Sequence, residues 1–180
     1  MASILAFNGS NSSKSINYEL VKYASSLIQD HEVNLLKMSR YPFPMYSEDL
    51  EKSDGYLNSL IELKNDIVSA DGLIISVNEH NTMLSAYFKN LIDWLSRIER
   101  KFLKDTKLLL LSTSPGQRGA QTALSLAKDV LPRFGAEIYD AFCLPSFNEN
   151  FSMDSKSISN VELDDQLKTI VTGFSNQFSD

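Results

Sequence analysis

The 180-residue sequence contains one cysteine, Cys143. A single thiol excludes a disulfide framework within the chain, a multi-cysteine zinc site and a redox-active cysteine pair. Because Cys143 falls in an apolar segment that predicts a strand, we expect a small buried side chain there and no reactive thiol. Any redox chemistry must then use the electrons of a bound cofactor.

Basic charge and long apolar runs are also scarce. Lys and Arg number 17 against 23 Asp and Glu, which gives a net charge of −6 and an isoelectric point near 4.9. This acidic balance argues against nucleic acid as a partner. No apolar run approaches the roughly 20 residues that span a bilayer, and the first residues do not resemble a signal peptide. We therefore expect a cytoplasmic protein without a membrane span.

The remaining composition is that of an ordinary folded domain, with 43% hydrophobic and 22% charged residues. The length suits one domain over residues 1–180, and no repeat or linker divides it. Short apolar runs alternate with longer amphipathic segments. The runs that predict strands are Ser3–Asn8, His31–Met38, Gly72–Val77, Lys107–Ser112 and Glu137–Leu144. The segments that predict helices are Asn17–Gln29, Asp54–Ala70, Leu84–Arg97, Ala120–Phe134 (followed by Gly135 as a left-handed stop) and Leu163–Phe178.

This alternation predicts an α/β fold. Strands that are apolar on both faces belong in a parallel sheet covered by helices on each side. We expect a doubly wound three-layer sandwich with five parallel strands in the order 2-1-3-4-5. Ligands of such sheets bind beyond the carboxyl ends of the strands, where the order reverses. Function is therefore sought in the loops after the first, third and fourth strands.

The loop after the first strand, residues 9–17, combines hydroxyls, amides and a helix N-terminus. Ser10, Ser12, Ser15 and Asn17 offer donors to a phosphate, and the helix adds unpaired N–H groups and a favourable dipole. The loop has neither the G-x-G-x-x-G spacing of a dinucleotide site nor a P-loop. An N-cap within an ordinary polar loop is the alternative, and the residues alone favour neither interpretation.

The other two loops are also polar. Residues 78–83 offer amides and the His80 imidazole to a planar ligand. A role of His80 as a catalytic base is not favoured, because no nucleophile is evident as its partner. One imidazole with one carboxylate also predicts no metal site. A hydrogen-bonding surface histidine is the alternative. In residues 112–120, Ser114, Gln117 and Arg118 offer donors, and the glycines either admit a ligand or only shape a tight turn.

Four segments together resemble one family. Residues 9–17 (GSNSSKSIN) are similar to G-S-x-R-x-x-S-x-N. Residues 78–83 (NEHNTM) and 88–97 (FKNLIDWLSR) are similar to P-E-Y-N-G-S and L-K-N-A-I-D-W-x-S-R. Residues 114–120 (SPGQRGA) resemble S-x-G-x-x-G-G, and residues 42–50 (PFPMYSEDL) resemble L-P-x-Y-x-x-D-L. The family is that of the NAD(P)H-dependent FMN reductases, flavodoxin-like proteins that include quinone, azo-dye and chromate reductases.

The resemblance, which runs from about residue 3 to 144, implies FMN as cofactor and NADPH or NADH as electron donor. It also implies a quinone, azo compound or free flavin as acceptor, and a homodimer or homotetramer. Hydride would pass through the flavin, so no side chain is expected to act as a catalytic acid, base or nucleophile. The residues expected to bind the cofactor are Ser10, Ser12, Ser15, Ile16, Asn17, Glu79, His80, Asn81, Thr82, Ser114, Gly116, Gln117 and Gly119.

Several positions depart from the family pattern. Ser12 replaces an arginine, His80 a tyrosine, Thr82 a glycine and Asn78 a proline, so we expect weaker flavin binding than in typical members. A flavodoxin-like electron carrier, or a binding module without flavin, therefore stays as the alternative function. Tyr46 is expected either to border the acceptor pocket or to pack.

Overall fold

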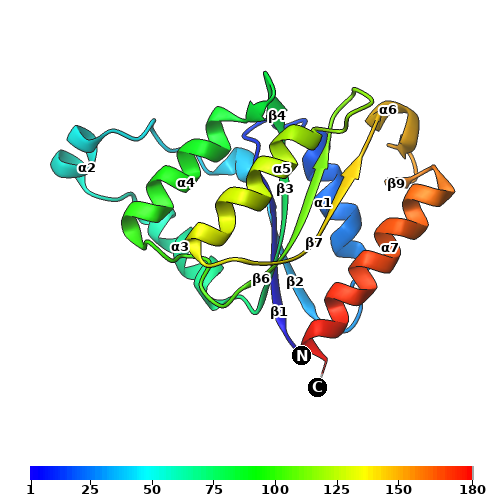
Figure 1. Cartoon of the computed structure of the whole chain (residues 1–180). Helices are drawn as coiled ribbons and strands as arrows, with labels where there is room; N and C mark the ends of the chain where they lie inside the picture. Colours follow the sequence, from blue (N-terminus) through cyan, green and yellow to red (C-terminus); the bar gives the residue numbers. More distant parts are fainter. Residues whose placement is uncertain (180) are drawn as a thin grey trace.

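The centre of the protein is a five-stranded parallel sheet (Figure 1). A computed structural model describes residues 1–179 of the chain. The strand order is β2-β1-β3-β6-β7, which confirms the predicted order 2-1-3-4-5. The strands are β1 (Ser3–Asn8), β2 (Glu32–Leu36), β3 (Gly72–Val77), β6 (Lys107–Thr113) and β7 (Glu137–Leu144).

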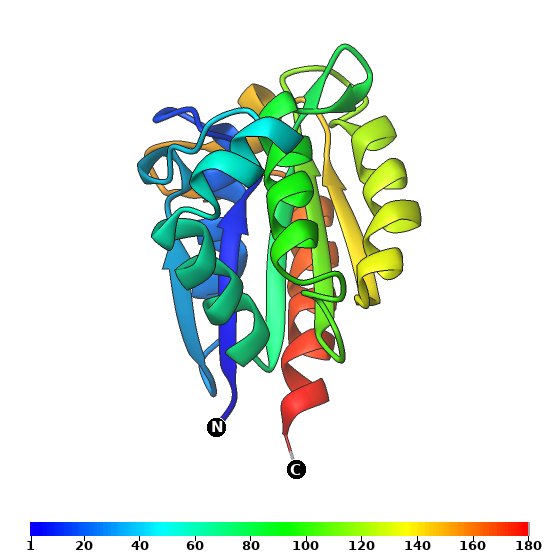
Figure 2. The same ribbon diagram turned by 90° about the vertical axis from the view of Figure 1, so that its left-hand side faces the viewer.

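Helices cover both faces of this sheet, as Figures 1 and 2 show. One face carries α1 (Ile16–Ser26) and α7 (Val161–Ser175). The other carries α3 (Asn58–Ser69), α4 (Ala86–Ile98) and α5 (Gln121–Val130). The chain is therefore the predicted three-layer sandwich.

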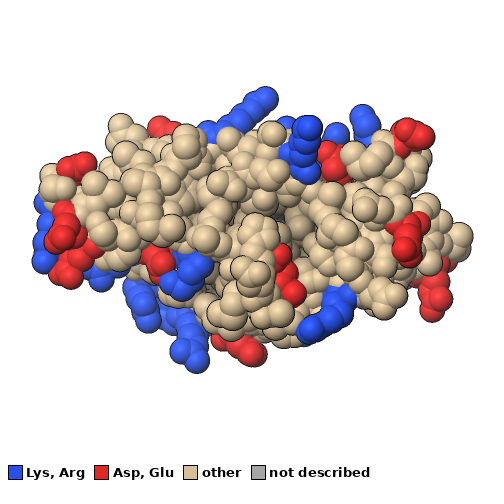
Figure 3. All heavy atoms as spheres, turned by 90° about the horizontal axis from the view of Figure 1, so that it is seen from above, with Lys and Arg blue, Asp and Glu red and all other residues tan. Residues whose placement is uncertain are grey.

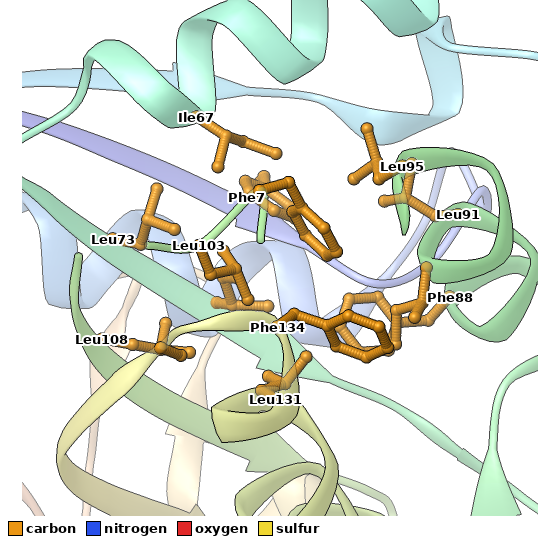
Figure 4. Close-up of a cluster of buried hydrophobic side chains, with 14 of the residues drawn as sticks. Phe7, Ile67, Leu73, Phe88, Leu91, Leu95, Leu103, Leu108, Leu131 and Phe134 are labelled. Atoms are coloured by element: carbon orange, nitrogen blue, oxygen red, sulfur yellow. The ribbon is translucent and has the colours of Figure 1, made fainter. Parts of the chain in front are cut away.

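Alternate side chains of each strand enter two separate cores. On β1, Leu5 and Phe7 pack with α3, α4 and α5, whereas Ile4 and Ala6 pack with α1 and α7. The core beneath α3, α4 and α5 is drawn in Figure 4. Since both faces of the central strands are buried, these strands are continuous apolar runs in the sequence.

The helix ends differ from prediction mainly where one residue breaks the backbone. The helix predicted over Asp54–Ala70 is wrong at its start, because Gly55 has a φ of 71° and separates α2 (Glu48–Asp54) from α3. The helix predicted over Ala120–Phe134 ends as a 3-10 turn, η2 (Leu131–Phe134). Gly135 follows with a φ of 106°, which confirms the left-handed stop.

The short elements were not predicted. They are the hairpin of β4 (Glu79–His80) and β5 (Met83–Leu84), helix α6 (Phe147–Asn150), the hairpin of β8 (Phe151–Ser152) and β9 (Ser157–Ile158), and the 3-10 turns η1 (Met38–Arg40) and η3 (Asn176–Phe178). In residues 1–179 no helix is long and apolar enough to cross a membrane.

Candidate functional site

The polar loops meet above three neighbouring strands. In the sheet β1 pairs with β3, and β3 pairs with β6. Their carboxyl ends lie on the face seen in Figure 3, where the middle of the surface is mostly uncharged. A hollow of about 290 Å³ lies there. It is lined by Ser10, Ser12, Lys14, Ser15, Ile16, Asn17, Asn78, Glu79, His80, Thr113, Ser114 and Pro115.

Three serine hydroxyls of the first loop are free to donate a hydrogen bond to a ligand. Ser10 Oγ accepts from the N–H of Ser12 at 3.2 Å, and Ser12 Oγ accepts from the N–H of Lys14 at 3.3 Å. Ser15 is the N-cap of α1, and its Oγ accepts from the N–H of Tyr18. Within residues 1–179 none of these hydroxyls donates a hydrogen bond, so each retains a proton for an anion. With the N-terminus of α1 beside them, they form a set of donors suited to phosphate.

Asn17 lines the hollow and also connects three elements around it. Its Oδ1 accepts from the hydroxyl of Ser76 at 2.6 Å and from the N–H of Thr113 at 3.1 Å. Its Nδ2 donates to the carbonyl of Thr113 at 3.1 Å. These bonds fix the first turn of α1 to the ends of β3 and β6. The Asn17 side chain therefore shapes the hollow: its Oδ1 has two protein donors, and its Nδ2 uses one of its two hydrogens.

The Glu79 side chain also has a protein partner. Its Oε2 accepts a hydrogen bond of 3.0 Å from the N–H of Ala123 in the first turn of α5. The residue before this helix, Ala120, has a φ of 68° and supplies no side-chain cap. The Glu79 carboxylate takes the place of that cap and meets the positive end of the helix dipole. Lys14 is thus the one charged side chain lining the hollow that has no protein partner among the described residues.

The β4–β5 hairpin carries the remaining residues of the second loop. Asn81 and Thr82 form its tip with φ values of 52° and 63°, the backbone of a two-residue type I′ turn. Both are exposed and do not line the hollow. His80 does line it, and its Nε2 lies 3.4 Å from Nδ2 of Asn78. Of the four residues predicted in this loop, Glu79 and His80 line the hollow, and Asn81 and Thr82 lie at the exposed tip of the hairpin.

The two glycines of the third loop differ in what they permit. Gly119 has a φ of 55°, and a Cβ there would lie 2.5 Å from Sγ of Cys143. A Cβ on Gly116 would meet only Ser114 Oγ, at 3.8 Å. Only glycine fits at position 119, which agrees with the interpretation that this glycine shapes a tight turn. Ser114 lines the hollow, whereas Gly116, Gln117 and Gly119 do not.

Cys143 lies behind this loop and is half-buried. Its thiol donates to the carbonyls of Arg118 and Gly119 at 3.3 and 3.2 Å. Burial raises the pKa of the thiol above its usual 9.0. Cys143 is therefore a protonated packing residue beside β6, although it is less buried than predicted.

A second hollow, also of about 290 Å³, adjoins the first and shares Asn78 and His80 with it. Its other lining residues are Asn11, Phe43, Met45, Ser85, Ala86, Tyr87 and Asn90. The Tyr87 hydroxyl donates to the carbonyls of Met38 and Tyr41, both at 3.0 Å, and burial raises the pKa of Tyr87. This second hollow has aromatic and thioether walls with a polar side, which suits a planar ring.

Sequence reasoning missed most of the second hollow. The Pro42-Phe43-Pro44 segment was noted only for its similarity to the family pattern. Tyr46 was expected either to border the acceptor pocket or to pack. Its ring packs against the ring of Trp94 at 5.1 Å, and it does not line either hollow. The signal that was available is the pair of prolines, which cannot donate to a sheet and so predict a segment lying outside it.

Fold and site together define the class: a flavodoxin-like α/β protein whose polar hollow lies at the switch point of its sheet. A model of the family described as NADPH-dependent FMN reductase matches residues 2–148. The protein belongs to this family of flavin-dependent NAD(P)H oxidoreductases.

Individual relatives are distant. An uncharacterised protein of Mycoplasma pneumoniae is 29% identical over 146 residues, which cover 78% of this chain and 86% of that protein. A quinone reductase of Escherichia coli K12 is 34% identical over 88 residues, or 49% of this chain and 46% of that enzyme. The structure of the NAD(P)H:(acceptor) oxidoreductase FerB from Paracoccus denitrificans has a TM-score of 0.79 at 24% identity, covering 98% of this chain and 96% of FerB.

Proposed function

We propose that the protein binds FMN and passes electrons from NADPH or NADH to a small-molecule acceptor: a quinone, an azo compound or free flavin. The observation that carries the proposal is the set of three hydroxyls on Ser10, Ser12 and Ser15. Each accepts a backbone hydrogen bond and keeps its own proton, and all three line the hollow into which α1 begins. The family match covers the same residues.

These residues fit the phosphate of FMN. The serine hydroxyls and the first N–H groups of α1 supply neutral donors, and the Lys14 ammonium supplies the one charge. A net charge of −6 on the whole chain does not oppose this binding, because the donors are local. Ser12 stands where the family pattern has arginine, so phosphate is held here mainly by hydroxyls and backbone.

The remaining loops would position the ring and the reactants. FMN held there would supply two-electron redox chemistry between a nicotinamide and an acceptor, with protons exchanged with solvent. Asn78 and His80 lie where the two hollows join and offer amide and imidazole hydrogen bonds to the edge of a planar ring. Phe43, Met45 and Tyr87 offer apolar contact in the second hollow, where water would be displaced by a nicotinamide or acceptor ring.

The test begins with the purified protein. We expect bound FMN, recognised by its visible absorption and released by heat, and expect anaerobic NADPH or NADH to bleach that absorption. Addition of a quinone should restore it. Protein that neither retains nor takes up FMN would overturn the proposal. FMN that binds but is not reduced by either nicotinamide would replace the enzyme with a flavodoxin-like electron carrier.

We further propose that the protein is a homodimer or homotetramer. A third hollow of about 390 Å³ lies between α4 and α5. Its walls are mainly apolar, namely Met83, Leu84, Ile92, Leu126, Val130 and Phe134, with Lys89, Asp93, Ser96 and Arg100 around them. Such a face, apolar inside and charged around it, suits a two-fold contact between copies.

Sedimentation measures this directly. The mass of two or four chains is expected, and Met83→Asp should lower it, because Met83 is 58% exposed beside this hollow. Met153→Asp, at a methionine that is 55% exposed and outside the hollow, is the control. A wild-type mass of one chain would contradict the assembly.

A further inference from the structure

One wall of the second hollow belongs to a segment that is not part of the sheet. Residues 41–56, here called the strap, run from the turn η1 to the start of α3 and include α2. Pro42 and Pro44 lie in its first part, where the backbone has no regular structure. Because proline lacks an N–H group, this part cannot form the ladder that holds a strand. The strap must therefore be fixed by other contacts.

Asn90 of α4 fixes the inner part of the strap. Its Oδ1 accepts from the N–H of Tyr46 at 2.7 Å, and its Nδ2 donates to the carbonyl of Pro44 at 2.9 Å. Nε1 of Trp94 donates to the same carbonyl, also at 2.9 Å. Asn90 is 5% and Trp94 1% exposed. One carboxamide thus holds the backbone on both sides of Met45, much as a neighbouring strand would.

The outer part of the strap is fixed around Glu51. This carboxylate accepts from Nε of Arg97 at 3.0 Å and from the hydroxyls of Tyr46 and Tyr56, both at 2.8 Å. The rings of both tyrosines meet the Trp94 ring edge-on, at 5.1 and 6.4 Å. Asn90, Trp94 and Arg97 follow one another at helical spacing, so one face of α4 carries every anchor.

The anchored segment presents two side chains to the second hollow. Phe43 packs on the Tyr87 ring at 4.9 Å, which fixes its orientation. Met45 is 67% exposed, although the residues on either side of it are held by Asn90. An apolar side chain that is free at its tip and fixed at its backbone, next to a hollow, is placed to contact a ligand.

We propose that Met45 selects among acceptors and that Asn90 is the positioning residue that presents it. This inference rests on the proposed function, since it takes the second hollow as the place where the acceptor binds. Methionine is unbranched and polarizable, so it adapts to the edges of flat aromatic rings and contacts larger rings over more area. Acceptors with two fused rings should therefore depend on Met45 more than acceptors with one ring.

The first experiment substitutes Met45 itself. With menadione, which has two fused rings, Met45→Ala is expected to raise KM about fivefold, and with 1,4-benzoquinone by less than about twofold. Met153→Ala, a substitution of an exposed methionine on the β8–β9 hairpin, should change neither value. The affinity for FMN should stay at the wild-type value in both variants. Equal effects of Met45→Ala on the two quinones, or none, would overturn the assignment of Met45.

The second experiment substitutes the anchor. Trp94 is the only tryptophan of the chain and bonds the strap, so its fluorescence reports whether the strap is held. In Asn90→Ala we expect emission shifted to the red, stronger quenching by acrylamide, and a KM for menadione raised about tenfold, as expected for one or two lost hydrogen bonds. Should Asn90→Ala not fold, Glu51→Gln loosens the outer anchor without removing a side chain and should move the same readouts in the same direction.

The outcomes separate the two proposals. Wild-type quenching of Trp94 and wild-type KM in a folded anchor variant that still binds and reduces FMN would overturn the positioning role alone. A wild-type protein that binds no FMN would overturn the proposed function and with it the acceptor assignment. The quenching of Trp94 would still show whether Asn90 holds the strap.

Discussion

The carboxylate of Glu79, on the short strand that follows β3, accepts a 3.0 Å hydrogen bond from the backbone N–H of Ala123 in α5. A residue of the second loop thus caps the helix that follows the third loop. Two of the loops around the first hollow are held in a fixed relation by this bond. The geometry of the site therefore depends on Glu79, whose Oε2 is bonded to α5.

Substitution Glu79→Ala should lower the free energy of unfolding by about 1 kcal/mol, because it removes both a cap and a favourable charge at the N-terminus of α5. Urea unfolding followed by circular dichroism measures the change. Glu162→Ala, in the first turn of α7, is the control and should cost clearly less, because within residues 1–179 the Glu162 side chain forms no hydrogen bond. A Glu79 variant as stable as the wild type would contradict the capping role.

The glycine pair of the third loop gives a second prediction. Gly119→Ala should lower the free energy of unfolding by about 2–4 kcal/mol, since the new methyl group would overlap Cys143 and the φ of 55° disfavours a side chain. Gly116→Ala, three residues away in open space, should change it by less than about 1 kcal/mol. Thermal unfolding of both variants measures the difference. Similar losses in the two would show that Gly119 is not a packing requirement.

The tip of the β4–β5 hairpin is expected to be strained. Thr82 has a φ of 63°, where a β-branched side chain is disfavoured. Thr82→Gly should therefore raise the free energy of unfolding by about 0.5–1 kcal/mol. Thr169→Gly, within α7, should lower it by a similar amount, because glycine is a poor helix former. A loss of stability in Thr82→Gly would refute the left-handed backbone at the tip.

The strap should respond to acid through Glu51. The Arg97 guanidinium, together with the hydroxyls of Tyr56 and Tyr46, holds the pKa of this carboxyl below its ordinary 4.5. Since the folded pKa is depressed, the stabilisation is fully present above pH 4.5 and is lost as the pH falls through the folded pKa. Acrylamide quenching of Trp94 should rise over that acidic range and stay constant above it.

Glu51→Gln is the matched control for this titration. It should show the increased quenching already at neutral pH and little further change on acidification, with far-UV circular dichroism reporting that the fold persists. A wild-type protein whose Trp94 quenching is the same above and below pH 4.5, while its fold is intact, would contradict the role of the Glu51 charge.

The sequence predicted the sheet well for a physical reason. A short apolar run rich in β-branched residues, such as Gly72–Val77, is typical of a strand covered on both faces, and the structure buries every residue of it. The break at Gly55 escaped prediction, because the apolar stripe of the predicted helix begins only at Leu57 and the polar residues before it do not mark where the helix starts. The loops were also located correctly, since the strand order alone brings their ends together.

Individual site residues were harder to predict, because a side chain's partner is set by the tertiary fold. Asn17 and Glu79 both line the hollow, but the sequence did not reveal their hydrogen bonds to Thr113 and Ala123, which lie 96 and 44 residues away. Met45 and Asn90 gave no such signal, although the structure brings both to the second hollow. Spacing along the chain does not reveal contacts of this kind.

The central claim is that the hydroxyls at the start of α1 hold the phosphate of FMN. Its most direct test compares the affinities for FMN and riboflavin, which lacks the phosphate, by quenching of flavin fluorescence. We expect FMN to bind at least about a hundredfold more tightly, as several charge-assisted hydrogen bonds imply. Ser12→Asp should abolish most of that difference, while Ser69→Asp, at the far end of α3, should leave it unchanged. Equal affinities for FMN and riboflavin in the wild type, or no effect of Ser12→Asp, would contradict the phosphate site.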